Sequence, residues 1–259
     1  MPEGDTVWQT ARRLHRALAG AALTHADLRV PRHATADLRG RTVVEVVARG
    51  KHLLIRIEPD LTVHSHLGMD GSWRVRPASG RVPGPGAHRV RAVLGNARWL
   101  AVGSELASLD LVRTVDEGSL VGHLGPDLLG TDWDADEAVR RLAASPDRPV
   151  VEALLDQRNL AGLGNVYAAE LLFLRGVRPS TPVSEAGDVD RLVRLAREVL
   201  RANRDRTGHV TTGDRRPGRR HWVYGRAGEP CRRCGTQIDR GEAAGRVTYW
   251  CPRCQPARP

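Results

Sequence analysis

The spacing of hydrophobic residues changes along the chain, and the first half changes from a helical to a strand period. Val7, Ala11, Leu14 and Leu18 recur at helical spacing before Gly20, so a helix is predicted directly behind the first few residues. From about residue 42 to residue 115 the pattern becomes a series of short β-rich runs separated by Gly, Pro and Asp. The predicted strands are 42–48, 52–57, 61–66, 72–76, 88–94, 98–102 and 109–115. Regular short strands of this kind predict a β-sandwich or flattened barrel.

The second half of the chain returns to a helical period. Predicted helices cover 134–144, 149–157, 165–176 and 187–203, and the last of them carries one apolar face. The fold class is therefore α+β and multidomain. We expect an N-terminal β-sandwich with flanking helices (1–120), a linker (121–133), a helical domain with a basic loop (134–226) and a zinc finger (227–259).

The four cysteines of the chain form two C-x-x-C pairs, Cys231/Cys234 and Cys251/Cys254, separated by sixteen residues. This spacing is typical of a zinc ribbon, in which two thiolate knuckles hold one structural ion. Disulfides are the alternative, and the cytoplasmic setting expected for this chain disfavours them. Arg246 lies between the knuckles, where it would be carried on a hairpin and could contact a phosphate.

Composition limits the kind of partner. No run of apolar residues is long enough for a membrane span, and the acidic start does not look like a secretory signal, so we expect a cytoplasmic protein. The net charge of +10 is concentrated at the end: residues 201–259 hold 14 Arg against 5 acidic residues, whereas residues 1–200 hold 26 cations against 25 acids. This excess indicates a surface that binds polyanions, nucleic acid first, although a solvated basic face is the alternative.

Lys51 stands out because it is the single lysine among 40 Lys and Arg residues. Lysine can give up its proton and acts as a compact point charge, whereas arginine stays protonated. Lys51 is thus a candidate for chemistry or for a tight phosphate contact. Chance survival of one surface lysine is the weaker interpretation.

A second candidate for chemistry is the start of the chain. Removal of Met1 would expose the ring nitrogen of Pro2, a secondary amine that could attack an aldehyde-like carbon and form an iminium. Glu3 would be placed to move protons at that carbon. Frayed, solvated chain starts are the common alternative.

Two glycine-rich turns complete the set of candidates. Met69 lies in the predicted tight loop 66–71 and could act as a wedge between bases, or fold back into the core. Gly164 and Asn165 lie where a glycine turn leads into a helix, and that arrangement suits a phosphate, although ordinary helix packing explains such turns too.

Taken together, these motifs resemble the formamidopyrimidine-DNA glycosylase and endonuclease VIII family of base-excision repair enzymes. The resemblance covers nearly the whole chain, with the motifs in the expected order. It rests on Pro2-Glu3-Gly4, Gly50-Lys51, Gln157 followed by Gly162-Leu163-Gly164-Asn165-Val166-Tyr167, and the ribbon that ends in Cys254-Gln255.

The resemblance implies a role for each matched residue. Pro2 would be the nucleophile, Glu3 the acid that assists opening of the deoxyribose ring, and Lys51 the catalytic lysine. Asn165, with Gly164 beside it, and Arg246 would bind DNA phosphates through a helix–two-turn–helix motif and the zinc hairpin. Met69 would fill the space left by the flipped nucleotide, on a looser match.

The same resemblance implies a bifunctional glycosylase and abasic-site lyase that acts on damaged DNA as a monomer in the nucleoid. Pro2-Glu3-Gly4 favours the endonuclease VIII branch and oxidised pyrimidines. Many family members have Pro-Glu where Asp5-Thr6 stands here, so the second glutamate has no match. The alternatives are an oxidised-purine glycosylase and a DNA-binding protein without catalysis.

Overall fold

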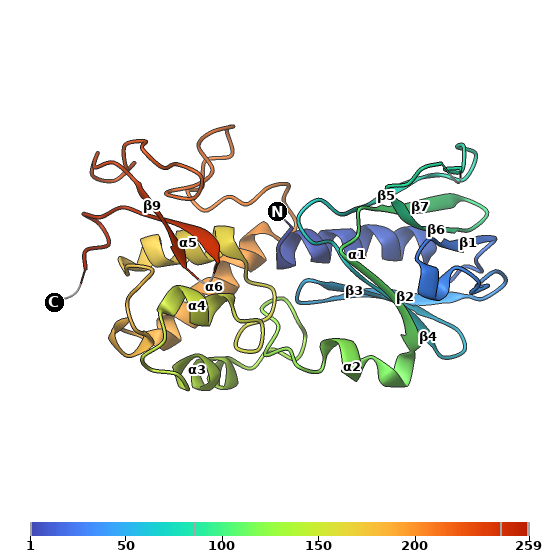
Figure 1. Ribbon diagram of the computed structural model, residues 1–259, viewed down its shortest axis with the longest axis horizontal. Coiled ribbons are helices and arrows are strands. Elements are labelled where there is room, and N and C mark those ends of the chain that lie inside the picture. Colours follow the sequence, from blue (N-terminus) through green and yellow to red (C-terminus); the bar gives the residue numbers. More distant parts are fainter. Residues whose placement is uncertain (1, 85, 244, 258–259) are drawn as a thin grey trace. The chain divides into compact units, whose positions relative to one another are not determined.

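The computed structural model describes residues 2–84, 86–243 and 245–257, and the chain divides after His123 into two compact units (Figure 1). The first unit contains two four-stranded sheets, and every strand pairing in them is antiparallel. One sheet has the order β1-β6-β7-β5 and is built from His25–Leu28, Val90–Gly95, Trp99–Ser104 and Ser72–Pro77. The other has the order β2-β3-β4-β8 and is built from Val43–Arg49, His52–Ile57, Leu61–His66 and Ser108–Arg113.

Helix α1, Gly4–Leu18, contacts strands of both sheets and shares their core. Its buried stripe contains the four residues whose spacing predicted it. We call this apolar cluster the sandwich core; it joins Leu14 and Leu18 to residues such as Leu53, Ile55 and Leu94 from the two sheets. Strands of both sheets turn alternate residues to this core, and the other face of β6 and β7 carries a second, smaller apolar cluster of Val90, Val93, Leu100 and Val102. The predicted sandwich with a flanking helix is confirmed.

Small differences from the predicted elements have local causes. The strand predicted from residue 88 begins at Val90, because Val90 N donates to Ala87 O and closes a turn there. The pattern does not predict strand β1, since its four residues are mostly half-buried and show no clear alternation. Short helical segments at the edges complete the first unit: η1 (Pro31–His33), η2 (Thr114–Asp116) and α2 (Gly118–Val121).

The second unit contains helices α3 (Ala135–Ala143), α4 (Val150–Leu155), α5 (Asn165–Arg175) and α6 (Val189–Asn203), the short η3 (Val183–Glu185), and a hairpin of β9 (Asp239–Ala243) and β10 (Arg246–Trp250). Asp134 and Asp188 cap α3 and α6 by accepting from the backbone N–H of Glu137 and Arg191. Gly176 caps the C-terminus of α5, and its φ of 67° places it in the left-handed region.

The segment 121–133, predicted as a linker, contributes to the packing of the second unit. Leu124 and Leu128 are buried. Gly125 N donates to Gln157 O, and Ala161 N donates to Pro126 O. These bonds fix the segment against the turn that precedes α5.

No helix in the described ranges is long and apolar enough to span a membrane.

Candidate active site and nucleic-acid interface

The start of the described chain is held by helix α1. Pro2 is half-exposed, whereas the Glu3 side chain is fully buried at the N-cap position of the helix. Val7 N donates to Glu3 O at 3.0 Å, which closes the first helical turn. The partial positive charge of a helix N-terminus favours a carboxylate at this position. Pro2 and Glu3 therefore stand on a rigid support rather than on a frayed end.

Lys51 lies in the two-residue turn between β2 and β3. The next residue, His52, begins β3, as predicted. Arg49 and His52 pair across this turn. Gly50 has a φ of 58°, a conformation that tight hairpin turns need and that a side chain would strain. The turn thus fixes the backbone that carries Lys51 at the end of the sandwich.

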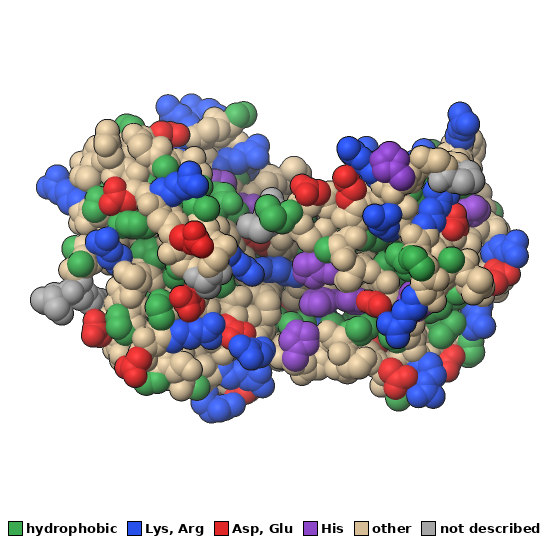
Figure 2. All heavy atoms as spheres, viewed as in Figure 1, with side chains coloured by type: hydrophobic (Ala, Val, Ile, Leu, Met, Phe, Trp, Pro, Cys, Tyr) green, Lys and Arg blue, Asp and Glu red, His purple; other side chains and the backbone are tan. Residues whose placement is uncertain are grey.

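A chain of histidines begins directly after Lys51. His52 on β3 lies opposite His66 on β4, and its Nδ1 is 2.8 Å from His64 Nε2. His64 Nδ1 is 3.4 Å from Asp110 Oδ2 on β8. The His123 ring lies edge-on to His52 at 6.2 Å between centroids. Figure 2 shows histidine side chains gathered on the face that it draws.

Burial favours the neutral imidazole in His52, His64 and His66. It lowers the pKa of His52 to about 3, and the neighbouring His64, His66, His123 and Lys51 act in the same direction. Burial also lowers the pKa of His64, against the opposing pull of Asp110, and that of His66, with help from Lys51. A neutral pair needs one donor and one acceptor, so the bond to Asp110 assigns a proton to His64 Nδ1, and His52 Nδ1–H donates to His64 Nε2. Strand alternation at His64 and His66 was the signal in the sequence that could have indicated this cluster.

Met69 stands at the tip of the loop between β4 and β5 and is 70% exposed. Gly68 has a φ of 64°, and a Cβ there would lie 2.7 Å from Ala107 Cβ. Gly71 is equally constrained, since a Cβ would clash with Leu67 O. The two glycines allow the close packing that directs Met69 outward, and the alternative of a Met folded into the core is wrong.

In the second unit, the turn before α5 is held by one side chain. Gln157 Nε2 donates to Leu163 O at 2.8 Å, and Gln157 Oε1 accepts from Gly162 N at 3.0 Å. Gly162 has a φ of 100°, and Gly164 in extended conformation forms the N-cap of α5. The result is a rigid turn with the helix N-terminus and Asn165 at one point.

Asn165 connects this turn to the hairpin. Its Nδ2 donates to Val247 O at 2.6 Å, next to Arg246. Its Oδ1 is buried and has no hydrogen-bond partner within the described ranges. Arg246 begins β10 with an exposed side chain. The structure therefore brings the turn and the hairpin together, although they are far apart in the sequence.

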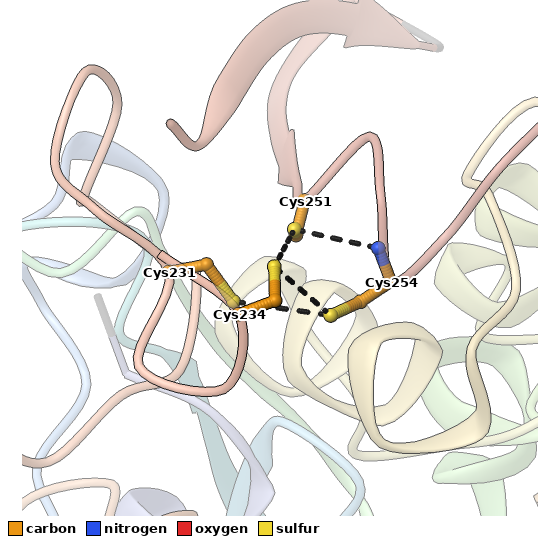
Figure 3. Close-up of side chains that lie close together, drawn as sticks. All are labelled: Cys231, Cys234, Cys251 and Cys254. Carbon is orange, nitrogen blue, oxygen red and sulfur yellow. Dashed lines mark hydrogen bonds between the residues drawn. The ribbon is translucent and has the colours of Figure 1, made fainter. Parts of the chain in front are cut away.

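The four cysteines lie at the base of the hairpin, and their Sγ atoms are all within 4.8 Å of one another (Figure 3). The Cys231–Cys254, Cys234–Cys251 and Cys234–Cys254 sulfur distances are 4.0, 3.5 and 3.5 Å. A tetrahedral zinc ion with Zn–S bonds of about 2.3 Å needs sulfurs about 3.8 Å apart. The backbone N–H of Arg233 and that of Cys254 point at sulfurs at 3.4 Å, as in thiolate knuckles. The donor set fits one tetrahedral ion.

The basic segment before the finger is anchored by a residue that the sequence did not indicate. Glu170 on α5 is fully buried and accepts from the backbone N–H of Trp222 at 2.7 Å and from those of Val223 and Tyr224 at 2.8 Å. Thr211 Oγ1 also donates to it. One carboxylate thus holds three successive backbone N–H groups of this segment, beside the apolar packing of Trp222, Val223 and Tyr224.

Three models of known protein families match nearly the whole chain. Residues 1–125 match the model of the formamidopyrimidine-DNA glycosylase N-terminal domain, residues 124–212 that of the formamidopyrimidine-DNA glycosylase H2TH domain, and residues 228–257 that of a zinc finger found in FPG and IleRS. Similar proteins include a probable endonuclease 8 2 of Streptomyces coelicolor, 58% identical over 98% of this chain and 94% of the relative.

Another similar protein is the DNA-(apurinic or apyrimidinic site) lyase Nei2 of Mycolicibacterium smegmatis, 51% identical over 99% of this chain and 100% of the relative. A solved structure of Lactococcus lactis formamidopyrimidine-DNA glycosylase, non-covalently bound to DNA containing an AP site, is similar with a TM-score of 0.83. The two sequences are 25% identical, and the match covers 98% of this chain and 100% of that one.

Proposed function

We propose that Pro2 is the nucleophile of this chain, which belongs to the formamidopyrimidine-DNA glycosylase and endonuclease VIII family. Pro2 would serve the DNA glycosylase and abasic-site lyase activity of the chain in base-excision repair. The observation that carries this proposal is the Pro2-Glu3 pair on the N-terminus of α1, in a chain that matches the family model from its first residue. The relatives named endonuclease 8 2 and Nei2 support the same reaction class.

The proposed reaction begins at the sugar. The Pro2 nitrogen attacks C1′ of a nucleotide flipped out of the duplex, and the bond from C1′ to the base breaks, so the base leaves with a proton. Glu3 donates a proton to the ring oxygen as the deoxyribose opens and an iminium forms. The iminium acidifies C2′–H, and loss of that proton expels the 3′ phosphate. A second elimination expels the 5′ phosphate, and water then releases Pro2.

The remaining predicted residues hold the DNA. Asn165, with Gly164 beside it, and Arg246 would contact phosphates, whereas Lys51 would act in catalysis. Met69, exposed at its loop tip, would occupy the space left by the flipped nucleotide. One structural zinc ion on Cys231, Cys234, Cys251 and Cys254 would fix the hairpin that carries Arg246. We expect a monomer that acts in the cytoplasm on nucleoid DNA.

The favoured substrates are oxidised pyrimidines. Two observations support them: Gly4 follows Pro2-Glu3, and relatives more than 50% identical to this chain carry the names endonuclease 8 2 and Nei2. An oxidised-purine glycosylase is the second candidate, because the family model matched by residues 1–125 is that of formamidopyrimidine-DNA glycosylase.

Borohydride trapping on a panel of lesion-bearing oligonucleotides tests the proposal. Reduction of the iminium should leave a covalent protein–DNA adduct, with more adduct on oxidised pyrimidines than on oxidised purines. Pro2→Thr should lose trapping and excision. Glu3→Gln should lose base removal but retain cleavage at a ready-made abasic site, because the sugar ring there opens without the enzyme.

The matched control is a protein with one extra residue before Pro2, assayed before and after that residue is removed. The extension converts the amine into an amide and should abolish trapping, and its removal should restore it. Peptide mapping of the adduct identifies the nucleophile. A sugar remnant on Lys51 with Pro2 unmodified would overturn the assignment, and DNA binding without any cleavage would favour a non-catalytic protein.

A further inference from the structure

The outer face of the β1-β6-β7-β5 sheet carries a hollow of about 340 Å³ that the proposed chemistry does not use. It opens beside β5 and the end of β7. Trp73 and Val75 of β5 pack into the sandwich core, so the alternate residues of that strand face the hollow. Its polar lining consists of Ser72, Arg74, Arg76, Arg89, Ser104 and Glu105.

Cross-strand pairs between β5 and β7 form the floor of the hollow. Ser72 on β5 lies opposite Ser104 on β7, and Arg74 lies opposite Val102. Pro83 closes one side, and Arg29 fixes that part of the chain by donating to Pro83 O at 2.5 Å and to Gly84 O at 2.9 Å. Sheet pairing and these two bonds therefore set the positions of the lining residues.

The charges and donors of the hollow point to an anion. The lining contains three arginines and a single acidic residue, Glu105, whose Oε1 lies 3.6 Å from Arg89 Nε. Arg76 donates to Arg81 O with one nitrogen, but its Nε is buried and has no hydrogen-bond partner among the described residues. A buried N–H without a partner is destabilising. An anion in the hollow would satisfy it.

We propose that this hollow binds a phosphate group of the DNA backbone next to the Met69 loop. Arginine forks and serine hydroxyls are suited to phosphate oxygens. Ser72 follows Met69 by three residues, so the two lie within about 10 Å along the chain. The close approaches of Gly68 to Ala107 and of Gly71 to Glu105 O link the same loop to the connection between β7 and β8, which carries Glu105 of the lining. The inference rests on the proposed function, since it assumes that Met69 meets DNA.

The test is the salt dependence of binding to a duplex with an abasic-site analogue. Each phosphate neutralised contributes a slope of about −0.9 to log K against log salt. In the double variant Arg74→Gln/Arg76→Gln the slope should become shallower by about one, and affinity at low salt should fall by about tenfold. Arg91→Gln, an exposed arginine of the same sheet outside the lining, is the matched control and should leave both unchanged.

A thermal melt of each protein checks that it is folded. If the double variant is not folded, the single variant Arg89→Gln tests the same hollow. An unchanged slope in folded variants would overturn the proposal. So would a result in which inorganic phosphate stabilises the wild type but not the variants while the DNA slope stays the same, because the ligand would then be a free anion. Absence of cleavage by the wild type would instead count against the proposed function.

Discussion

The two units hold their functional residues in different ways. In the first, α1 and both sheets share the sandwich core, and Pro2, Lys51 and Met69 lie at the ends of elements that this core fixes. In the second, Asn165 and Arg246 come from distant segments, and the hairpin rests on a small cluster in which Cys231 and Cys251 are two of the six buried residues among those described. We call this cluster the finger core.

It follows that DNA binding by the second unit depends on its metal site, whereas the fold of the first unit does not. A core as small as the finger core is marginal without a metal or another cross-link. Phe173 stacks on Trp222 at 5.3 Å between centroids, and the Arg233 guanidinium lies 4.5 Å from the Phe173 ring. These contacts add to the thiolate site and do not replace it. The first unit, which carries the residues proposed for chemistry, should therefore stay folded under conditions that abolish the proposed binding of DNA by the second unit.

Removal of zinc should give the largest effect, a complete loss of DNA binding with the first unit still folded. Chelation should unfold the hairpin and abolish binding to lesion DNA, because metal binding and folding are coupled in such sites. The amides of β3 and β4 should keep their protection from hydrogen exchange in the same full-length protein. Full DNA affinity in metal-free protein would contradict this expectation, and re-addition of zinc is the control.

Lys51→Arg should give the next largest effect, on cleavage rather than on folding. The charge is kept, but the compact amine is lost and the tight turn must hold a larger group. We expect a severe loss of strand cleavage, with the salt dependence of DNA binding close to that of the wild type. A loss of cleavage no larger than the loss of DNA affinity would reduce Lys51 to an electrostatic contact.

Arg246→Ala should weaken binding by about tenfold on every substrate and make the salt slope shallower by about one. The reason is loss of one phosphate contact at the exposed start of β10. Arg253→Ala, a change in the last knuckle turn, serves as a control for lost charge alone. A change of lesion preference with an unchanged slope would show that Arg246 reads bases instead.

The smallest effect expected is acid sensitivity of the first unit. Unfolded His52 titrates near its ordinary pKa of 6.5, whereas the folded value of the pKa is about 3. The unfolded state therefore binds the proton first, and stability is lost as the pH falls below about 6.5. Between about pH 7 and pH 5 the loss should be on the order of 1 kcal/mol, seen as lower amide protection of β3 and β4.

The groups facing His52 in this titration are His64 and His66 on β4, His123, and Lys51, with Asp110 behind His64. His52→Gln should flatten the pH dependence. His88→Gln, a change at an exposed position in the same unit, should not. A steeper loss in His52→Gln would mean that other groups control the acid response.

Most of the fold could be predicted from the sequence because the relevant patterns are local. The stripe of α1, the alternating strands and the cysteine spacing each need only neighbouring residues. The histidine chain and the arginine hollow were not predicted, because they depend on which strands pair: His52 meets His64 only through the β3–β4 register, and Ser72 meets Ser104 only through β5–β7. Glu170 was missed for the same reason, since its partners lie more than forty residues away.

The roles of Pro2, Glu3, Lys51, Met69, Gly164, Asn165 and Arg246 stay predictions. The structure adds what supports them, such as the buried Glu3 on a helix N-terminus and the bond from Asn165 to Val247. Sequence could not supply those facts, since burial and contact depend on the packed chain.

The single lysine also makes the molecule unusually simple to label. Reductive methylation places two methyl groups on a primary amine and one on a secondary amine, so Lys51 and a Pro2 amine exposed by loss of Met1 would give adducts of different mass. No other lysine competes for the reagent. Because Lys51 lies in a tight turn, the rate at which its peptide gains mass reports on the site at one residue, and mass spectrometry can follow it with the wild-type protein and unlabelled DNA.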